Sequence, residues 1–137
     1  KIIKIMSEIK EEIRNGRIIN KEIVTAAAEE LAKKRNAKIT KEMMRIAVDS
    51  EFERKSALLD LQKNRDREEP IKACLKAKEA NENAVKEGKM TPEEFRSANG
   101  KADDEKEKAL RQVENEYYTL RDQLRKQCYD VLNDWDD

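Results

Sequence analysis

A ten-residue segment, KEGKMTPEEF at residues 86–95, predicts a tight turn between two helices. Gly88 suits the left-handed backbone conformation that ends a helix, because it has no Cβ to clash there. Thr91 can cap the next helix, with Pro92 in the first helical position and Glu94 completing a capping box. Two apolar residues stand at the spacing of a hydrophobic staple around this cap: Met90 and Phe95. The chain is therefore expected to turn within about three residues and to return as an antiparallel helix.

The composition agrees with long helices and argues against disorder. Charged residues make up 44% of the 137 residues and aromatic residues 4%, with only 3 Gly and 2 Pro. Such a composition is typical of long helices and coiled coils. Disordered chains combine low hydrophobicity with a high net charge, whereas this chain has zero net charge and periodic apolar residues. We expect an all-α protein with a thin, aliphatic core.

Three helices are predicted in residues 1–65. Apolar residues recur there at helical spacing in three segments: 2–14, 21–35 and 41–64. Asn15 and Gly16 end the first segment, while Asn20 and Thr40 stand where the next two helices need their caps. The residues expected to form the core of this part are Ile2, Ile5, Met6, Ile9, Ile13, Ile23, Val24, Ala27, Ala28, Leu31, Met43, Met44, Ala47, Val48, Phe52, Leu58, Leu59 and Leu61. This pattern favours a small helical bundle of about three helices.

Residues 66–137 are predicted to form a long antiparallel helical hairpin around the turn at Gly88–Thr91. Pro70 is expected to interrupt the chain, so that a fourth helix runs over about residues 67–87 with the proline in its first turn. A fifth helix follows the turn, and Asn99-Gly100 is a candidate point for a bend or a break in it. The hairpin is predicted either as a domain of its own or as one continuous domain with the N-terminal part.

The fifth helix carries a coiled-coil-like seam. The apolar residues recur at spacings of 3 and 4, with a stutter that locally unwinds a supercoil: Leu110, Val113, Tyr117, Leu120, Leu124, Cys128, Val131 and Trp135. The expected intrachain mate is a face of small residues on the fourth helix: Ala73, Ala77, Ala80 and Ala84. Because the fifth helix is about twice as long as the fourth, its distal part must pack on the N-terminal helices, on a second copy or on a foreign partner. At least part of it is expected to be an intermolecular surface.

No constellation of catalytic or metal-binding residues is evident in the sequence. The chain has no His, no phosphate-binding glycine loop, no nucleophile-elbow motif and no paired Cys motif. Four acidic residues near the C-terminus lack the glycine and the bidentate glutamate of a calcium loop: Asp130, Asp134, Asp136 and Asp137. We therefore expect no enzyme activity, no cofactor and no metal site.

Several features bear on the cellular compartment. Cys74 and Cys128 are far apart and form no motif, so no disulfide framework is expected. A reducing compartment is then the default, and cytoplasmic localisation is expected. No apolar run approaches the roughly 18 residues that span a bilayer, so no membrane association is expected. The amphipathic start of the chain resembles neither a signal peptide nor a transit peptide.

A protein-interaction surface is predicted on the last helix. Tyr118, Arg121, Arg125 and Tyr129 form a stripe beside the leucine seam, and Trp135 lies beyond it. Tyr, Trp and Arg are the residues that most often anchor protein interfaces, and four of the six aromatic residues of the chain stand in this helix. The alternative is that Tyr117 and Trp135 complete the bundle core, while the arginines form ion pairs along the surface.

A nucleic-acid surface is the second candidate. Basic residues cluster around the turn between the second and third helices: Lys33, Lys34, Arg35, Lys38, Lys41 and Arg45. Two helices joined by a short basic turn also describe a helix-turn-helix motif. Cations at a helix C-terminus, however, simply complement its dipole, and Glu29, Glu30 and Glu42 would oppose a phosphate backbone.

Taken together, these patterns favour a non-catalytic helical interaction protein, such as an adaptor, an assembly factor or an inhibitor. It is expected to bind a protein partner, to self-associate as an oligomer, or both, through its helix faces. The alternative is a nucleic-acid-associated module that uses the basic turn.

Overall fold

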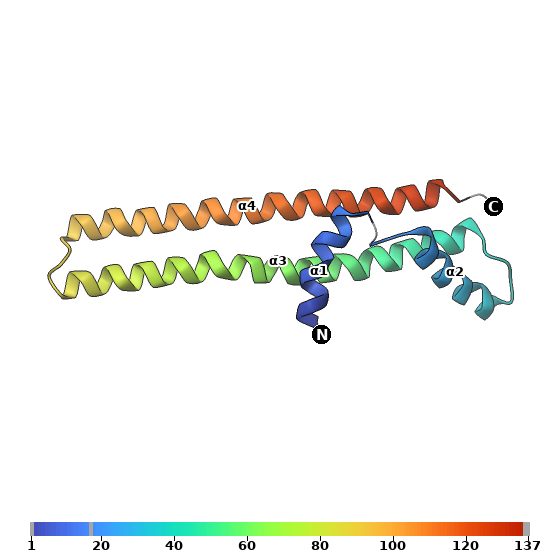
Figure 1. Cartoon of the computed structure of the whole chain (residues 1–137), viewed down its shortest axis with the longest axis horizontal. Helices are drawn as coiled ribbons and strands as arrows, with labels where there is room; N and C mark the ends of the chain where they lie inside the picture. Colours follow the sequence, from blue (N-terminus) through green and yellow to red (C-terminus); the bar gives the residue numbers. More distant parts are fainter. Residues whose placement is uncertain (1, 17, 136–137) are drawn as a thin grey trace. The chain divides into compact units, whose positions relative to one another are not determined.

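The protein is all-helical. The computed structural model describes residues 2–16 and 18–135, with side chains from residue 8 onward. In that part of the chain there are four helices (Figure 1): α1 (Ile2–Arg14), α2 (Lys21–Arg35), α3 (Lys41–Lys86) and α4 (Pro92–Asn133). The two long helices α3 and α4 pack against each other, which confirms the predicted all-α class and the helical hairpin.

Helices α1 and α2 begin and end where the sequence predicts, and α3 begins where predicted but continues past the predicted end at residue 64. The Asn20 side chain accepts a hydrogen bond of 2.9 Å from the backbone N–H of Ile23 at the start of α2. Thr40 caps α3 in the same way, accepting from the N–H of Met43 at 3.2 Å. Gly16, just after α1, has a φ of +70°. Each of these three helix ends thus has a residue whose side chain or backbone freedom satisfies it locally.

The turn between α3 and α4 has the predicted capping geometry. Gly88 has a φ of +73°, and its N–H bonds to the carbonyl of Val85, while the N–H of Lys89 bonds to that of Ala84. These two bonds form a Schellman motif, which satisfies the last carbonyls of α3. Thr91 and Glu94 exchange backbone and side-chain hydrogen bonds of 3.0 and 3.2 Å, a complete capping box. The two helix caps predicted in residues 86–95 are therefore confirmed.

The predicted interruption of the helix at Pro70 is wrong, and the chain does not break at the candidate point Asn99-Gly100. α3 continues through Pro70, and α4 continues through Gly100. Pro70 cannot donate a hydrogen bond to the carbonyl of Asp66, but neighbouring strong helix formers and the absence of any adjacent turn residue keep the helix continuous. Asn99-Gly100 is a dipeptide that favours turns, but Gly100 lacks the left-handed backbone conformation that would make it a helix end.

The chain divides into two compact units, and each is built partly from α3 and α4. Unit 1 consists of the residues up to Gln62 together with those from Tyr117 onward. Unit 2 consists of Lys63–Glu116. Unit 1 differs from the predicted N-terminal part, residues 1–65, because it also includes the end of α4. The predicted division into residues 1–65 and 66–137 stays a prediction.

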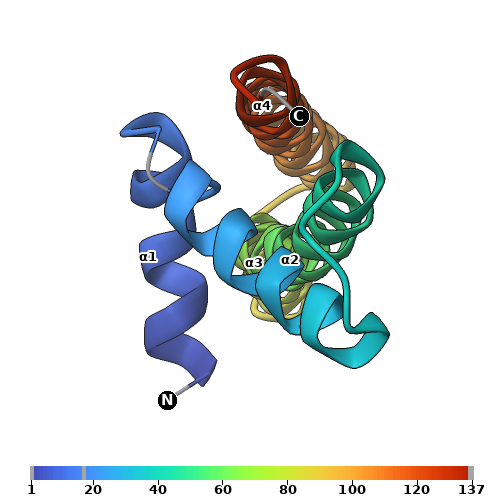
Figure 2. The same ribbon diagram turned by 90° about the vertical axis from the view of Figure 1, so that its right-hand side faces the viewer.

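Unit 1 has an aliphatic core. Figure 2 looks toward this unit and shows α1 and α2 next to each other, with α3 and α4 beside them. Its buried apolar side chains, each less than a tenth exposed, come from all four helices and the turn after α1: Ile9, Ile13, Ile18, Ile19, Val24, Ala28, Ala32, Met43, Met44, Ala47, Val48, Leu59, Tyr117, Leu120, Leu124, Cys128 and Val131. The predicted seam is therefore buried within the chain from Tyr117 to Val131.

Contacts between α1 and α4 complete unit 1. The Gln127 side chain donates a 2.7 Å hydrogen bond to the backbone carbonyl of Ile13. The Lys10 ammonium lies 4.9 Å from the centre of the Tyr117 ring, within the range of a cation–π contact. The sequence left three possible partners for the distal part of the last helix: the N-terminal helices, a second copy or a foreign partner. In the structure the N-terminal helices cover the apolar seam of this part.

Some residues expected in the core lie at the surface. Ile23 is 39% exposed and Leu61 49% exposed. α2 buries the row Val24, Ala28 and Ala32, and Ile23 lies about 100° away from this row around the helix. Helical periodicity alone did not distinguish these neighbouring rows. The side chains of Ile2, Ile5 and Met6, which were also expected in the core, lie outside the described residues.

Unit 2 has almost no apolar core. Among its residues only Cys74 and Ala102 are buried. The prediction that a face of small residues on α3 packs against the seam is wrong, because Ala73, Ala77 and Ala80 are exposed. The half-buried or buried row on α3 is instead Arg67, Pro70, Cys74, Lys78 and Asn81. Half of the long hairpin is thus held by a polar contact between its helices.

Candidate interaction surfaces

An exposed face of α4 in unit 1 carries two tyrosines and two arginines. Tyr118 is 73% exposed and Tyr129 65% exposed, with Arg121 and Arg125 between them at spacings of 3 and 4 residues. We call these four residues the α4 aromatic face. The buried seam lies on the adjacent side of the same helix, so the tyrosines are exposed on a well-packed unit. Large rings exposed on an ordered helix are characteristic of interface anchors.

The arginines of this face are held by residues of α3. Arg121 forms an ion pair with Asp60. The guanidinium of Arg125 lies 5.9 Å from the centre of the Phe52 ring and 4.0 Å from a carboxylate oxygen of Asp122. These contacts fix the arginines on a half-exposed surface, which lowers the conformational entropy that a binding partner would have to remove.

A small hollow adjoins Tyr129. It has a volume of about 200 Å³ and lies between α3 and α4 in unit 1. Its lining is mainly apolar, with one acid and one base at its edge: Val48, Asp49, Phe52, Arg125, Cys128, Tyr129 and Leu132. A hollow of this size suits one apolar side chain of a partner rather than an extended ligand.

The thiol in this hollow is chemically unreactive. Burial, with a smaller contribution from the negative charge of Asp49, raises the pKa of Cys128 to about 11. At neutral pH Cys128 is therefore a neutral thiol, and the thiolate is the nucleophilic form of cysteine. Cys128 contributes apolar surface to the hollow. Both cysteines are free in the structure.

Trp135 lies apart from the α4 aromatic face, although the sequence grouped it there. It follows the end of α4 and lines a wide hollow of about 800 Å³ at the turn between α2 and α3. Lys33 and Lys38 line the same hollow, together with Glu29. The structure thus brings one residue of the predicted protein surface together with two residues of the predicted nucleic-acid surface.

The basic turn is fully accessible. All six of its residues are exposed: Lys33, Lys34, Arg35, Lys38, Lys41 and Arg45. Asn36, with a φ of 49°, ends α2 in a left-handed conformation, so Lys33, Lys34 and Arg35 form its last turn. Cations there complement the negative end of the helix dipole. The acidic residues Glu29 and Glu30 are exposed on the same helix.

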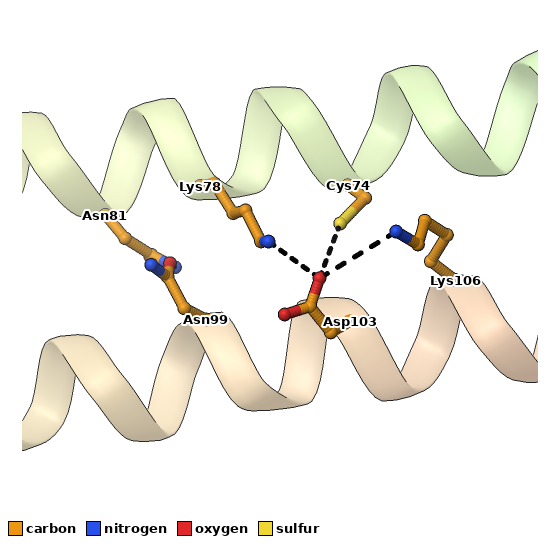
Figure 3. A network of polar contacts seen from close by, with 6 residues as sticks. All are labelled: Cys74, Lys78, Asn81, Asn99, Asp103 and Lys106. Carbon is orange, nitrogen blue, oxygen red and sulfur yellow. Dashed lines mark hydrogen bonds and ion pairs between the residues drawn. The ribbon is translucent and has the colours of Figure 1, made fainter.

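A polar layer between α3 and α4 in unit 2 was not predicted from the sequence (Figure 3). One carboxylate oxygen of Asp103 accepts hydrogen bonds from the Cys74 thiol at 3.6 Å and the Lys78 ammonium at 2.7 Å, and lies 4.0 Å from the Lys106 ammonium. The hydrogen bond between Lys78 and Asp103 lowers the pKa of Asp103 and raises the pKa of Lys78. This layer pairs α3 with α4.

A second pair extends the layer toward the turn. The Asn81 side chain donates a 3.0 Å hydrogen bond to Asn99. The pairing of these two residues could have been found from their positions in the sequence, because residues equally far from the turn at 88–91 lie opposite each other in an antiparallel hairpin. Polar pairs at such positions typically fix the register of two helices rather than bind a ligand.

The described part of the chain shows neither a metal-binding cluster nor a membrane-spanning helix. Within residues 2–16 and 18–135, no group of three or more His, Cys, Asp or Glu side chains is arranged to hold a metal ion. No helix in the part that the structure describes is both long and apolar enough to cross a membrane. Compared with known proteins, the chain matches no family model, no curated protein and no solved structure. Its function is therefore inferred from the surfaces described above.

Proposed function

We propose that this protein is a non-catalytic interaction protein, an adaptor, assembly factor or inhibitor, that binds a protein partner through the α4 aromatic face. The observation that carries the proposal is the exposure of Tyr118 and Tyr129, at 73% and 65%, on the best-packed unit of the chain. Anchors of this kind contribute most of the affinity of many interfaces. The two free thiols support a reducing compartment such as the cytoplasm.

The chemistry of this face defines the partner it suits. Arg121 and Arg125 stand between the tyrosines and are already oriented by Asp60 and Phe52. Such arginines bind carboxylates through paired hydrogen bonds. The apolar hollow beside Tyr129 accepts one side chain. A partner segment with an apolar anchor and neighbouring acidic residues matches these features.

Affinity capture tests the proposal. The tagged chain is used to capture partners from a lysate of the organism that encodes it, and the captured protein is then titrated against purified variants. Tyr118→Ala and Tyr129→Ala are each expected to weaken binding by about thirtyfold, and the double variant by more, because interface anchors each contribute about 2 kcal/mol. Helical content by circular dichroism should not change, since both rings are exposed.

The matched control is Gln123→Ala with Asp130→Ala. Both residues are exposed on α4 and lie away from the α4 aromatic face. This variant should bind like the parent. A captured partner whose affinity is the same for the tyrosine variant and the parent would contradict the proposal, as would unfolding caused by the tyrosine substitutions.

Nucleic-acid binding at the basic turn is a second candidate function. It is supported by six exposed cations and by the position of Trp135 in the same hollow as Lys33 and Lys38. Duplex DNA and RNA are titrated at low and at physiological salt, since phosphate contacts make affinity fall steeply with salt. We expect no binding at physiological salt. Tight, salt-sensitive binding that is lost in a variant with Lys33, Lys34, Arg35 and Lys38 replaced by Ala would favour this candidate instead.

A further inference from the structure

Unit 2 exposes two large aliphatic side chains on α3. Leu75 is 62% exposed and Ile71 39% exposed, one helical turn apart. They lie about a quarter of a turn around the helix from Cys74 and Asn81, which face α4. The pair therefore takes no part in the hairpin contact. In a four-helix bundle, each helix contacts two adjacent helices on faces that are about a quarter turn apart. The apolar pair therefore lies where a further helix could pack on α3.

The apolar pair belongs to a longer strip with coiled-coil spacing. Continuing at alternating steps of 3 and 4 residues gives what we call the α3 outer strip: Asn64, Glu68, Ile71, Leu75, Lys78 and Glu82. The apolar residues occupy its centre, an acid precedes them and a base follows them. Such a strip differs in charge toward its two ends, so it can pair with itself in only some orientations.

The charges select an antiparallel orientation of two copies. A parallel, in-register pair would place Glu68 against Glu68 and Lys78 against Lys78, which is unfavourable. An antiparallel pair with its twofold axis at residue 73 places Ile71 against Leu75 and Glu68 against Lys78. On the flank of the strip, Arg65 lies level with Asn81 of the second copy, and Glu79 of that copy is two residues, about 3 Å, further along the helix, within reach of the long Arg65 side chain. All of these pairings are complementary.

We propose that a second copy of this chain docks on the α3 outer strip in this antiparallel orientation. The proposal goes beyond the proposed function, because it uses a surface separate from the α4 aromatic face. The four apolar side chains around the axis, two from each copy, would cover one another. Because a single helix from each copy contributes, the contact is smaller than a standard protein interface and the dimer is expected to be weak and reversible.

Two lysines moderate the strength of this contact. Lys72 would lie close to the same residue of the second copy, but its ammonium is 3.9 Å from a carboxylate oxygen of Glu68 in its own chain. Lys78 is engaged by Asp103 at 2.7 Å, so it would be shared between the hairpin and the second copy. Both features favour a dimer that forms at high concentration only.

Sedimentation analysis of the full chain over a wide concentration range tests the proposal. The parent is expected to show a reversible monomer–dimer equilibrium. Leu75→Lys should raise the dissociation constant about tenfold or more, because it removes apolar contacts and adds a charge at the axis. The matched control is Ala80→Lys, which adds the same charge at an exposed position of α3 away from the strip and should leave the equilibrium unchanged.

The orientation has its own test. Arg65→Glu should weaken the dimer by bringing two acids close to each other, and adding Glu79→Arg should restore it. Failure of the second substitution to restore association would overturn the antiparallel arrangement. A parent that stays monomeric, or a dimer that Leu75→Lys leaves intact, would overturn the proposal as a whole. Neither result changes the capture experiment with Tyr118 and Tyr129, so the two proposals fail independently.

Discussion

The two units of this protein use the same pair of helices in opposite ways. In unit 1, α3 and α4 bury Leu59, Leu120 and Leu124 together with residues of α1 and α2. In unit 2 the same helices bury only Cys74 and Ala102 and meet through ion pairs and amide hydrogen bonds. Helix formation is thus sustained where a core is nearly absent. Since most helical stability in proteins comes from packing, unit 1 is expected to supply most of the free energy of folding.

The largest expected effect comes from removing core packing in unit 1. Leu124→Ala, at a fully buried position, should lower the free energy of unfolding by about 2–5 kcal/mol. The matched control Leu75→Ala, at an exposed position of unit 2, should change it by less than about 0.5 kcal/mol. Urea denaturation of monomeric protein followed by circular dichroism measures both. Equal effects of the two substitutions would show that the units do not differ in packing as described.

An intermediate effect of opposite sign is expected in unit 2. Pro70→Ala should stabilise α3 by up to about 3 kcal/mol, because it restores a backbone donor toward Asp66 and removes the clash of the ring. Native-state hydrogen exchange of the amides in residues 66–86 measures the change locally. Pro92→Ala is the control and should have little effect, since Pro92 occupies the first position of α4. Slower exchange throughout unit 1 as well would mean that the two units open together.

The smallest expected effect is at the turn of the hairpin. Thr91→Ala should cost about 1 kcal/mol, the usual contribution of a helix cap, and should speed exchange in the turns of α3 and α4 next to it. Phe95→Ala should cost more, because Phe95 is half-buried and is also the residue predicted to complete the hydrophobic staple. If both variants have the stability of the parent, the turn does not hold the two helices of unit 2 together.

Acid pH provides a separate measure of the same cap. Hydrogen bonding from the Thr91 backbone N–H, and then from its side chain, holds the pKa of Glu94 below its ordinary value of 4.5. The folded state therefore binds this proton less readily than the unfolded state, so the stabilisation is present above pH 4.5 and is lost as pH falls through the lowered value. Glu94→Gln should remove this part of the pH dependence in an acid titration of helix stability.

The features predicted correctly from the sequence depend on neighbours within one or two helical turns. Asn20, Thr40, Gly88 and Thr91 each end or begin a helix as expected. The buried seam from Tyr117 to Val131 was also predicted, because its spacing is sustained over several turns. The prediction of a helix break at Pro70 was wrong, because α3 continues through this proline. A proline alone does not end a helix when no turn residue accompanies it.

The candidate surfaces were predicted in part. Tyr118 and Tyr129 lie at the surface, but Trp135 lies with Lys33 and Lys38 at another hollow. The exposure of Ile71 and Leu75 was not anticipated, nor were the contacts of Arg121 with Asp60 and of Arg125 with Phe52. These contacts join residues more than sixty positions apart in the chain, and no local pattern specifies them.

The sequence by itself determined that the chain forms capped helices, where three of its turns lie, and which row of the last helix is apolar. These properties follow from backbone geometry and from side chains within four residues of each other. Only the tertiary structure decided which rows are buried, that the end of α4 completes the core of the N-terminal helices, and that Asp103 meets Cys74 and Lys78 across the hairpin. The physical reason is that burial depends on what the rest of the chain places against a surface, and a helix presents several similar rows that its own sequence does not rank.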